Sequence, residues 1–520
     1  MLIKKADLYF LGLGVMAIGL PVSEFLMSLS YMIIALAWLI DGTKKRQWND
    51  FKNNKLAWSG VLLFLIPLIA FFWSSNLDYA LSDLRIKLPL LLIPFLISSY
   101  TLSTKKFHIL LGLLIGSTFV GSVILFINYH LKLEGNLVNL RDVSIFISHI
   151  RFSLIIDICI FILFYAAIKW KNIYSLVAIG MSIWFIYFLF FLGSGNGFIG
   201  LLTVLLFSIV LLLVRSPYRK LSYVVLALFI VFSSYILFLG KASYQSHFVV
   251  KNEVYNTDSA IVLGATRFSL LEDKQLENGY YIWRNVSNKE LIREWGKLSE
   301  PAYYEYDTKG QPILGTLVRY LTSKALTKDS LGIHQLNAKD IENIQQGNYH
   351  FEQYRWNNLQ FRIDQLFYQL MAYYYQDDPG NKPFLQRYYY WKGGVSIIKE
   401  HPFFGVGTGD IQDSLNDYFK NEVSEMGSEF RHHTHNQYLS YFITSGVFGF
   451  LLFLWAVFYP LKLNRKHSKI LLLAHIVLLI SFITEDTLET QPGVTLYVLF
   501  IALAIALYNG NKEVSEAEYP

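Results

Sequence analysis

The C-terminal third of the chain contains three short stretches of side chains that can bind an anion or move a proton. In the first, Arg387 and Trp391 stand four residues apart, a spacing that puts both on one face of a helix. In the second, residues 431–436 read Arg-His-His-Thr-His-Asn, with three histidines in four positions. In the third, residues 484–487 read Thr-Glu-Asp-Thr and supply two adjacent carboxylates. Cations, imidazoles and carboxylates together suit acid–base chemistry beside a bound anion.

The histidine cluster admits two kinds of chemistry. A histidine with an ordinary pKa of about 6.5 is mostly neutral near neutral pH and can act as a general base. The alternative is a zinc site, to which Glu429 could add a carboxylate. We prefer the neutral base, so we expect no metal and no other cofactor. A carboxylate such as Asp486 would then orient the histidine or bind a polar acceptor, unless this stretch is only a solvated acidic loop.

A glycine triplet stands between the first two stretches. Residues 401–410 read His-Pro-Phe-Phe-Gly-Val-Gly-Thr-Gly-Asp. A nucleotide-binding loop would follow a strand and lead into a helix through Lys-Ser or Lys-Thr, and neither feature is present. We therefore do not assign nucleotide binding to these glycines, and we interpret His401 as a structural residue before Pro402.

The elements that must position these residues are membrane-spanning helices. Hydrophobic residues make up 53% of the 520 positions and charged residues only 16%, outside the range of an ordinary soluble protein. The apolar residues form long blocks, as a helix facing lipid requires. We predict an all-α polytopic membrane protein with about twelve transmembrane helices, at residues 7–22, 25–41, 57–73, 88–101, 108–128, 152–168, 175–192, 198–214, 221–239, 437–460, 470–484 and 493–508.

Lysine and arginine are concentrated in alternate loops, which predicts the orientation of the chain. Short cytoplasmic loops carry the basic excess, so both termini are expected in the cytoplasm of a cell with an inner membrane. The net charge of +6 is explained by this excess, and no nucleic-acid partner is expected. The first apolar segment has no small-residue cleavage site, so we expect it to be retained.

The same pattern divides the chain into four parts. Residues 1–239 hold helices 1–9, residues 240–436 form one large, mostly helical periplasmic domain, residues 437–508 hold helices 10–12, and residues 509–520 are a cytoplasmic tail. Within the domain, residues 289–295, 314–321 and 357–375 are expected to be helical, and residues 377–383 to form a turn. The single cysteine, Cys159, lies in a predicted span, so this domain has no internal disulfide.

Arginines on the outer side carry more information than those inside, because the topology makes outer cations scarce. Three qualify: Arg85 just before the fourth span, Arg151 just before the sixth, and Arg387. An arginine grips phosphate oxygens through two parallel hydrogen bonds. Arg85 and Arg151 have an alternative role, because an arginine at a helix end can simply extend to the membrane interface.

The order of these motifs resembles a known family. Arg-x-x-x-Trp at 387–391, His-Pro-x-x-Gly-x-Gly-x-Gly at 401–409 and His-Asn-x-x-Leu at 435–439 are followed by Ser-Gly-x-x-Gly at 445–449. This pattern resembles the O-antigen ligase and polymerase superfamily of bacterial membrane glycosyltransferases, and most of all the ligases. One departure is the turn at residues 194–197, which reads Ser-Gly-Asn-Gly where many members carry Ser-Arg-Gly.

The resemblance implies a GT-C-like fold and metal-independent transfer of a glycan from undecaprenyl diphosphate to an acceptor hydroxyl. The acceptor is expected to be lipid A-core or another hydroxyl, and membrane lipids are the remaining partners. His435, the histidine of the His-Asn-x-x-Leu motif, is then the general base. Substrate contacts are expected from Arg387, Arg151, Arg85, Trp391, Asn436 and Asp486.

The sequence is also compatible with other functions. An O-antigen polymerase and a protein O-oligosaccharyltransferase use the same donor chemistry with a different acceptor. A lipid-linked glycan transporter or binding scaffold would break no bond, and intramembrane polar residues such as Asp157 are common in transporters. The sequence shows no inverted repeat, and a transporter has no need of a large outer domain with clustered histidine and arginine, so transfer is preferred.

Overall fold

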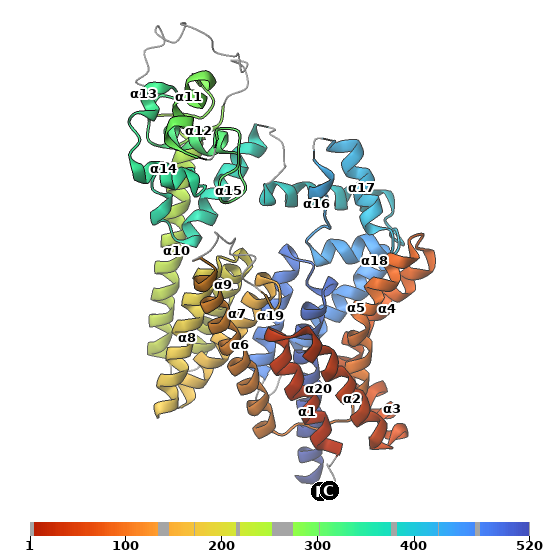
Figure 1. Ribbon diagram of the computed structural model, residues 1–520. Coiled ribbons are helices and arrows are strands. Elements are labelled where there is room, and N and C mark those ends of the chain that lie inside the picture. Colours follow the sequence, from red (N-terminus) through yellow and green to blue (C-terminus); the bar gives the residue numbers. More distant parts are fainter. Residues whose placement is uncertain are drawn as a thin grey trace. The chain divides into compact units, whose positions relative to one another are not determined.

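The computed structural model is almost entirely helical (Figure 1). It describes residues 5–133, 145–170, 172–214, 219–251, 274–300, 302–375, 382–424, 426–462 and 468–518. The chain forms two compact units. Unit 1 comprises Met1–His130, Leu140–Leu226 and Gln386–Pro520, and unit 2 comprises Leu131–Asn139 and Ala227–Leu385.

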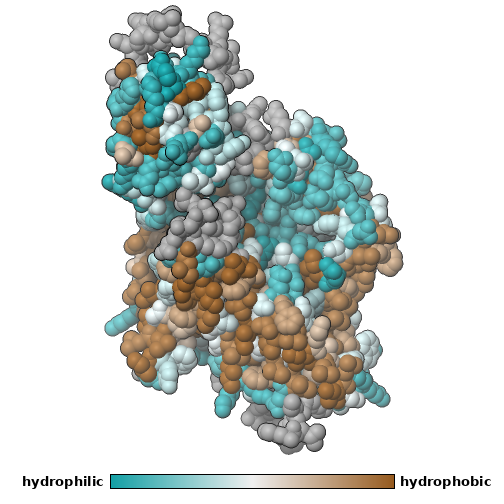
Figure 2. Space-filling model, in the orientation of Figure 1, coloured by the Kyte–Doolittle hydropathy of each residue, from teal (hydrophilic) through white to brown (hydrophobic). Residues whose placement is uncertain are grey.

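Every predicted span overlaps a helix. These helices are α1 (Lys5–Val22), α2 (Glu24–Asp41), α4 (Lys55–Ala70), α5 (Leu77–Leu96), α6 (Thr104–Leu133), α7 (His149–Lys169), α8 (Ile173–Leu192), α9 (Gly195–Val214), α10 (Arg219–Phe248), α18 (Gln437–Phe458), α19 (Ser468–Thr484) and α20 (Gln491–Glu518). Among the described residues, nine helices are long and apolar enough to cross a membrane, and α1 and α19 are shorter apolar helices. The prediction of an all-α polytopic membrane protein is confirmed. In Figure 2, hydrophobic residues (brown) predominate over much of the visible surface of α1, α2 and α6.

The fourth span was placed wrongly. We predicted residues 88–101, but α5 begins at Leu77, where the Asn76 side chain accepts a hydrogen bond from the backbone N–H of Tyr79, and it ends at Leu96. The missed turns carry Asp83 and Lys87, whose side chains pair at 2.7 Å inside the protein. Because the pair neutralises its own charges, helix continues through residues that a hydropathy pattern excludes.

The tenth span is also not continuous. Gly446 interrupts α18 with a φ of 62°, a conformation that glycine adopts readily. The loop at residues 401–410 pairs with the chain at this break: the Val406 N–H donates to the Ile443 carbonyl at 2.8 Å, and the Val447 N–H donates to the Pro402 carbonyl at 2.9 Å. Backbone groups released by the break are thus satisfied by the loop.

The rest of the glycine loop rests on the turn between α4 and α5. The Gly409 N–H donates to Ser74 Oγ at 3.0 Å. The Asp410 carboxylate accepts hydrogen bonds from the backbone N–H groups of Ser75 and Asn76, each at 2.8 Å for the shorter contact. A Cβ at Gly409 would lie 2.1 Å from the Asn76 carbonyl oxygen, so the glycine allows close backbone contact. These glycines have a structural role, in keeping with our rejection of a nucleotide loop.

The predicted boundary of the outer domain at residue 436 differs from the compact units. Residues 386–436 belong to unit 1, where α16 (Pro383–Glu400) and α17 (Ile411–Glu422) pack on the start of α18. Tyr390, Leu415 and Phe419 form the centre of this packing with Ile443. The hydrophobic contact with α18 is what draws the segment out of the expected domain.

Unit 2 contains five helices of the outer insertion and a two-stranded hairpin among its described residues. They are α11 (Asn288–Leu298), α12 (Ile313–Ser323), α13 (Ser330–Ile333), α14 (Ala338–Gln345), α15 (Asn358–Tyr374), β1 (Leu276–Glu277) and β2 (Tyr280–Tyr281). Trp295 and Tyr320 are fully buried in its core. The three predicted helical segments lie in α11, α12 and α15, while most of the predicted turn at 377–383 lies outside the described residues.

Candidate functional site

Glu485 contacts two of the arginines that we expected in the site, and also the expected histidine. It follows α19 in the turn between α19 and α20, which we call the acidic turn (residues 485–490), and its side chain is only 2% exposed. Its Oε1 lies 2.6 Å from Nη2 of Arg387, and its Oε2 lies 3.4 Å from Nη1 of Arg151 and 3.6 Å from Nδ1 of His435. One buried carboxylate therefore contacts two guanidinium groups and one imidazole.

Arg387 and Trp391 lie one turn apart on α16, as their spacing predicted. Trp391 packs partly buried against the core formed by α16, α17 and α18. Arg387 Nε and Trp391 Nε1 are both buried without an acceptor among the described residues. Buried donors without acceptors are rare, so each is a candidate contact for a ligand oxygen or water.

Arg151 lies in the first turn of α7, which begins after the capping residue Ser148. Its Nη2 donates to the Asp486 carbonyl at 3.2 Å, and its Nε is buried without an acceptor among the described residues. The start of a helix favours anions because its backbone N–H groups are unpaired and its dipole is positive there. Arg151 adds a fixed cation at such a position.

His435 is held in an unusual backbone conformation, with a φ of 47°. A non-glycine residue adopts this region rarely, and the surrounding contacts must stabilise it. The Asp486 carboxylate does so, because its Oδ2 accepts the His435 backbone N–H at 2.9 Å. The His435 side chain is 34% exposed, and its Nε2 forms no hydrogen bond with the part of the chain that the structure describes. A proton on Nδ1, facing Glu485, leaves the Nε2 lone pair available to accept one.

For Asp486 we expected either a contact with substrate or a role in orienting the histidine. Its carboxylate is buried, and its Oδ1 accepts from Ser440 at 3.0 Å and from Thr434 at 3.4 Å. Together with the bond from His435, these contacts occupy both oxygens. Asp486 therefore fixes the loop that presents His435 rather than offering a free acceptor to a ligand.

Asn436 is likewise a structural residue through its Oδ1. This atom accepts the Leu439 N–H at 3.1 Å and caps the start of α18. Asparagine is among the preferred N-cap residues. The spacing of the His-Asn-x-x-Leu motif is thus the spacing of a helix cap, which fixes the direction of α18 immediately after His435.

Arg85 does not join this cluster. Its side chain is exposed and forms no hydrogen bond or ion pair with the residues that the structure describes. Lys87 takes the inward position on α5 and pairs with Glu489 at 2.8 Å. Glu489 in turn accepts from Gln437 Nε2 at 2.9 Å. Glu489 and Gln437 were not expected in the site, and Lys87 was noted only as a second cation beside Arg85 before the fourth span. Two residues spaced by two lie on different faces of a helix, so only one of Arg85 and Lys87 can face inward.

Burial and neighbouring charges shift the pKa values of the carboxylates in the acidic turn in different directions. Burial opposes ionisation of Glu485, but the contact with His435 and the charges of the two arginines hold its pKa below the ordinary value. Burial and the neighbouring Glu489 raise the pKa of Asp486. Despite its burial, the charge of Lys87 lowers the pKa of Glu489 to about 2. Glu485 and Glu489 are therefore anionic and held by cations.

A family model described as O-antigen ligase matches residues 339–454. The chain carries an O-antigen ligase domain. The match includes Arg387, Trp391, His435 and Asn436, whereas Arg151 and the acidic turn lie outside the matched residues. The resemblance to the O-antigen ligase and polymerase superfamily is confirmed for these residues, and the family implies an enzyme of the glycosyltransferase type. No curated protein matches the sequence.

The three neighbouring histidines of the O-antigen ligase domain do not share a ligand position. His433 Nε2 lies 3.3 Å from the Tyr79 hydroxyl, and the rings of His432 and His435 are 6.5 Å apart between centroids. Burial and the neighbouring His435 lower the pKa of His432. Three ligands of one zinc ion must all lie about 2 Å from it, an arrangement these contacts do not provide.

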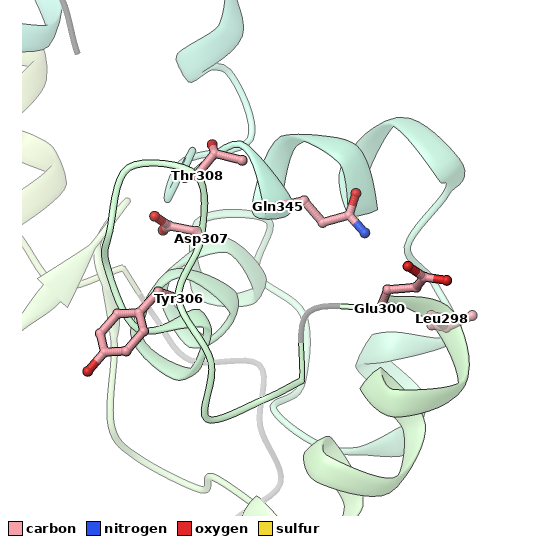
Figure 3. A pocket seen from close by; sticks show the side chains of 6 residues that line it. All are labelled: Leu298, Glu300, Tyr306, Asp307, Thr308 and Gln345. Atoms are coloured by element: carbon pink, nitrogen blue, oxygen red, sulfur yellow. The ribbon is translucent and has the colours of Figure 1, made fainter. Parts of the chain in front are cut away.

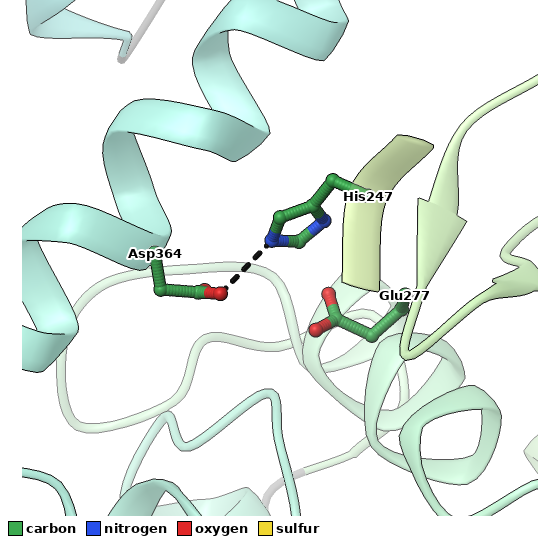
Figure 4. Close-up of side chains that lie close together, drawn as sticks. All are labelled: His247, Glu277 and Asp364. Carbon is green, nitrogen blue, oxygen red and sulfur yellow. Dashed lines mark hydrogen bonds and ion pairs between the residues drawn. The ribbon is translucent and has the colours of Figure 1, made fainter. Parts of the chain in front are cut away.

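Within the described residues, one group of three side chains has metal-ligand spacing, and it lies in unit 2. His247, Glu277 and Asp364 offer ligand atoms within 4.8 Å of one another (Figure 4). His247 Nε2 contacts Asp364 at 3.0 Å, and Arg319 Nη2 contacts Glu277 at 2.6 Å. Because an arginine and a histidine already face the two carboxylates, this group is a buried ion-pair network and does not fit a metal centre.

The turn at residues 194–197, where the family cation is missing, also has a structural role. Ser194 Oγ lies 3.0 Å from Ser153 Oγ on α7. Asn196 Oδ1 accepts a hydrogen bond from Thr484 at 2.7 Å, immediately before the acidic turn. The turn therefore supports the acidic turn and supplies no cation of its own, while Arg151 on the neighbouring α7 does.

A surface pocket in unit 2 contains none of the predicted site residues. It has a volume of about 500 Å³ and is lined by Leu298, Glu300, Tyr306, Asp307, Thr308 and Gln345 (Figure 3). The Asp307 carboxylate is occupied by Thr316 and by two backbone N–H groups. Figure 3 shows that the Tyr306 ring points away from Glu300 and Gln345, so the polar groups do not converge on one ligand.

Proposed function

We propose that the chain transfers a glycan from undecaprenyl diphosphate to an acceptor hydroxyl at the periplasmic face of the inner membrane, and that this acceptor is lipid A-core. The observation that carries the proposal is the contact of Glu485 with Arg387, Arg151 and His435. It brings phosphate-binding cations and a base with a free ring nitrogen to one buried carboxylate. Within the superfamily shown by residues 339–454, this combination suits transfer from a lipid diphosphate.

The donor diphosphate would bind the exposed side of Arg387, whose side chain is 28% exposed, with Arg151 at the start of α7 as a second cation. Arginine neutralises the diphosphate without losing its own proton at any relevant pH. The same cations stabilise the diphosphate as it leaves, since its negative charge increases in the transition state.

The acceptor hydroxyl would give its proton to Nε2 of His435 while its oxygen attacks the anomeric carbon of the donor sugar. A carbon–oxygen bond to the acceptor forms as the bond between that carbon and the phosphate oxygen breaks. The bonding electron pair leaves with the polyprenyl diphosphate, and the proton on His435 returns to solvent. Glu485, opposite Nδ1, stabilises the imidazolium that forms. No metal takes part in these steps.

The orientation that this reaction requires is also part of the proposal. Both termini lie in the cytoplasm and residues 240–436 in the periplasm. The even number of predicted spans supports this, as does the position of the start of α1 and the end of α20 at the same end of unit 1 (Figure 1). Alkaline phosphatase fused within the insertion should be active, and the same fusion at Asn509 should be inactive. The reverse pattern would overturn the proposed orientation.

Deletion of the gene tests the reaction and separates the acceptors. A ligase predicts lipopolysaccharide without its long glycan and accumulation of lipid-linked glycan. A polymerase predicts a glycan shortened to one unit, and a protein oligosaccharyltransferase predicts a mobility shift of a glycoprotein. Complementation should succeed with Arg85→Ala, which removes an exposed arginine outside the cluster, and fail with His435→Ala. Uptake of labelled lipid-linked glycan by vesicles without any product would instead indicate a transporter.

A further inference from the structure

The site that would bind the donor and the base that would activate the acceptor share one counter-ion. Glu485 Oε1 faces Arg387, and Oε2 faces both Arg151 and His435. The contact with Arg387 is close, at 2.6 Å, whereas the contact with His435 is long, at 3.6 Å. The carboxylate is thus committed first to the arginines and only weakly to the imidazole.

The burial of Glu485 strengthens its charge interactions with all three partners. Glu485 is 2% exposed, so water does not screen its charge, while the side chains of Arg387 and His435 are 28% and 34% exposed and can be reached by a ligand. An anion that binds Arg387 from the exposed side competes with Glu485 for the same positive charge. A charge interaction at short range in a buried site is several times stronger than in water. Competition for the charge of Arg387 therefore also changes the interaction of Glu485 with His435.

We propose that Glu485 couples donor binding to the strength of the base: a bound diphosphate weakens the hold of the arginines on Glu485, and Glu485 then pairs more closely with His435. His435 becomes a stronger base only when the donor is present. In the absence of donor, Glu485 occupies the arginines and His435 is a weaker base, so the site is protected against deprotonating water or acceptor unproductively. This inference rests on the proposed function and adds a positioning role for Glu485.

Glu485→Gln separates the two effects of the carboxylate. The amide keeps the size of the side chain but removes the charge that competes with the donor. Binding of a farnesyl-diphosphoryl monosaccharide to the purified full-length variant in detergent should become roughly tenfold tighter, since a competing charge-assisted contact is removed. Single-turnover transfer should become at least tenfold slower at pH 7 and should not recover as the pH rises, because an imidazole without its anionic partner is a weaker base that is already unprotonated. A merely structural carboxylate predicts weaker binding together with slower transfer.

The wild-type protein gives a measurement that does not depend on a variant folding. The probe is a diphosphate diester, which lacks the second phosphate ionisation near pH 6, so protons exchanged on binding belong to the protein. Calorimetry in two buffers of different ionisation enthalpy should show proton uptake on binding at pH 7. The uptake should disappear in His435→Ala and decrease in Glu485→Gln, while Lys399→Ala, which removes an exposed cation of α16 outside the cluster, should match the wild type.

The outcomes distinguish this inference from the proposed function. If glycan transfer is observed but Glu485→Gln binds the probe no more tightly than the wild type, the coupling is wrong and the transfer reaction stands. If no transfer is observed but Glu485→Gln binds the probe more tightly and wild-type binding takes up protons, the coupled anion site stands and the transfer reaction is wrong. Absence of proton uptake in the wild type overturns the coupling regardless of activity.

Discussion

Nδ1 of His435 faces the carboxylate of Glu485 at 3.6 Å. His435 lies just before α18 and Glu485 just after α19, fifty positions apart in the chain. The neighbouring Asp486 meanwhile holds the His435 backbone at 2.9 Å. Two adjacent carboxylates thus act on one histidine in different ways, one on its ring and one on its main chain. This division makes the two residues separable by mutation.

His435→Ala should leave donor binding nearly unchanged and lower transfer by about a hundredfold or more, the usual effect of a lost general base. The measurement is donor affinity alongside single-turnover transfer with purified protein. His432→Ala is the matched control, because it removes a histidine from the same loop that has no contact with Glu485 among the described residues. Near-normal transfer by His435→Ala would remove this residue from the mechanism.

Arg387→Ala should weaken donor binding and transfer together. It removes a charge-assisted contact to the diphosphate, worth about 1.5–3 kcal/mol, or roughly ten- to a hundredfold in affinity. Lysine should restore only part of the loss, because it supplies charge without the paired N–H groups. Equilibrium binding of a short-chain lipid diphosphate is the measurement, with Arg85→Ala as the control of equal charge. Equal losses for the two variants would argue against a specific site at Arg387.

Chelation should not affect transfer. The proposed steps use Arg387, Arg151, His435 and Glu485 and no metal, and the three neighbouring histidines do not share a ligand position. Activity of purified protein before and after dialysis against EDTA is the check. A loss that zinc restores would return the histidines to a metal role.

Gly446→Ala should destabilise unit 1 by about 2 kcal/mol or more. A Cβ at this position would lie 2.1 Å from the Phe403 carbonyl oxygen, and the φ of 62° is strained for alanine. The unfolding temperature in detergent is the measurement. Gly112→Ala in α6 is the control, because a Cβ there meets no atom within 4 Å. Equal unfolding temperatures for the two variants would show that the break in α18 is not required.

Asp364→Ala should destabilise unit 2 by about 3–5 kcal/mol, the cost of removing one partner of a buried ion pair. Burial opposes its charge, but His247 and Arg319 hold the pKa of Asp364 below its ordinary value. The stabilisation is therefore complete above the unfolded pKa of about 3.9 and is lost as the pH falls through the lower folded value.

Hydrogen exchange of α15 at pH 5 and at pH 3.5 measures this contribution. Protection in the wild type should begin to fall at the lower pH, and Asp364→Ala should already have lost it at pH 5. The exposed Glu342→Ala serves as the control. Protection in Asp364→Ala equal to that of the wild type at pH 5 would contradict the role of the network.

The sequence determined which segments are helical, and it predicted which residues could carry the chemistry. Apolar blocks predict spanning helices because a chain in lipid must satisfy its backbone bonds within each segment, and every predicted span overlaps a helix. The motif residues could also be recognised from the sequence, because His435 and Arg387 have distinctive side-chain chemistry and stand in a recognisable order. Local rules of this kind need no knowledge of what packs against what.

Only the tertiary structure decided how those residues are used. Whether Arg85 or Lys87 faces inward depends on how α5 packs, and the fourth span was misplaced because the Asp83–Lys87 pair forms only within the fold. The roles of Glu485 and Asp486 likewise depend on contacts with α7, α16 and the start of α18, far away in the chain. Two adjacent carboxylates are indistinguishable in sequence, and they differ here because one points at an imidazole and the other at a main-chain N–H.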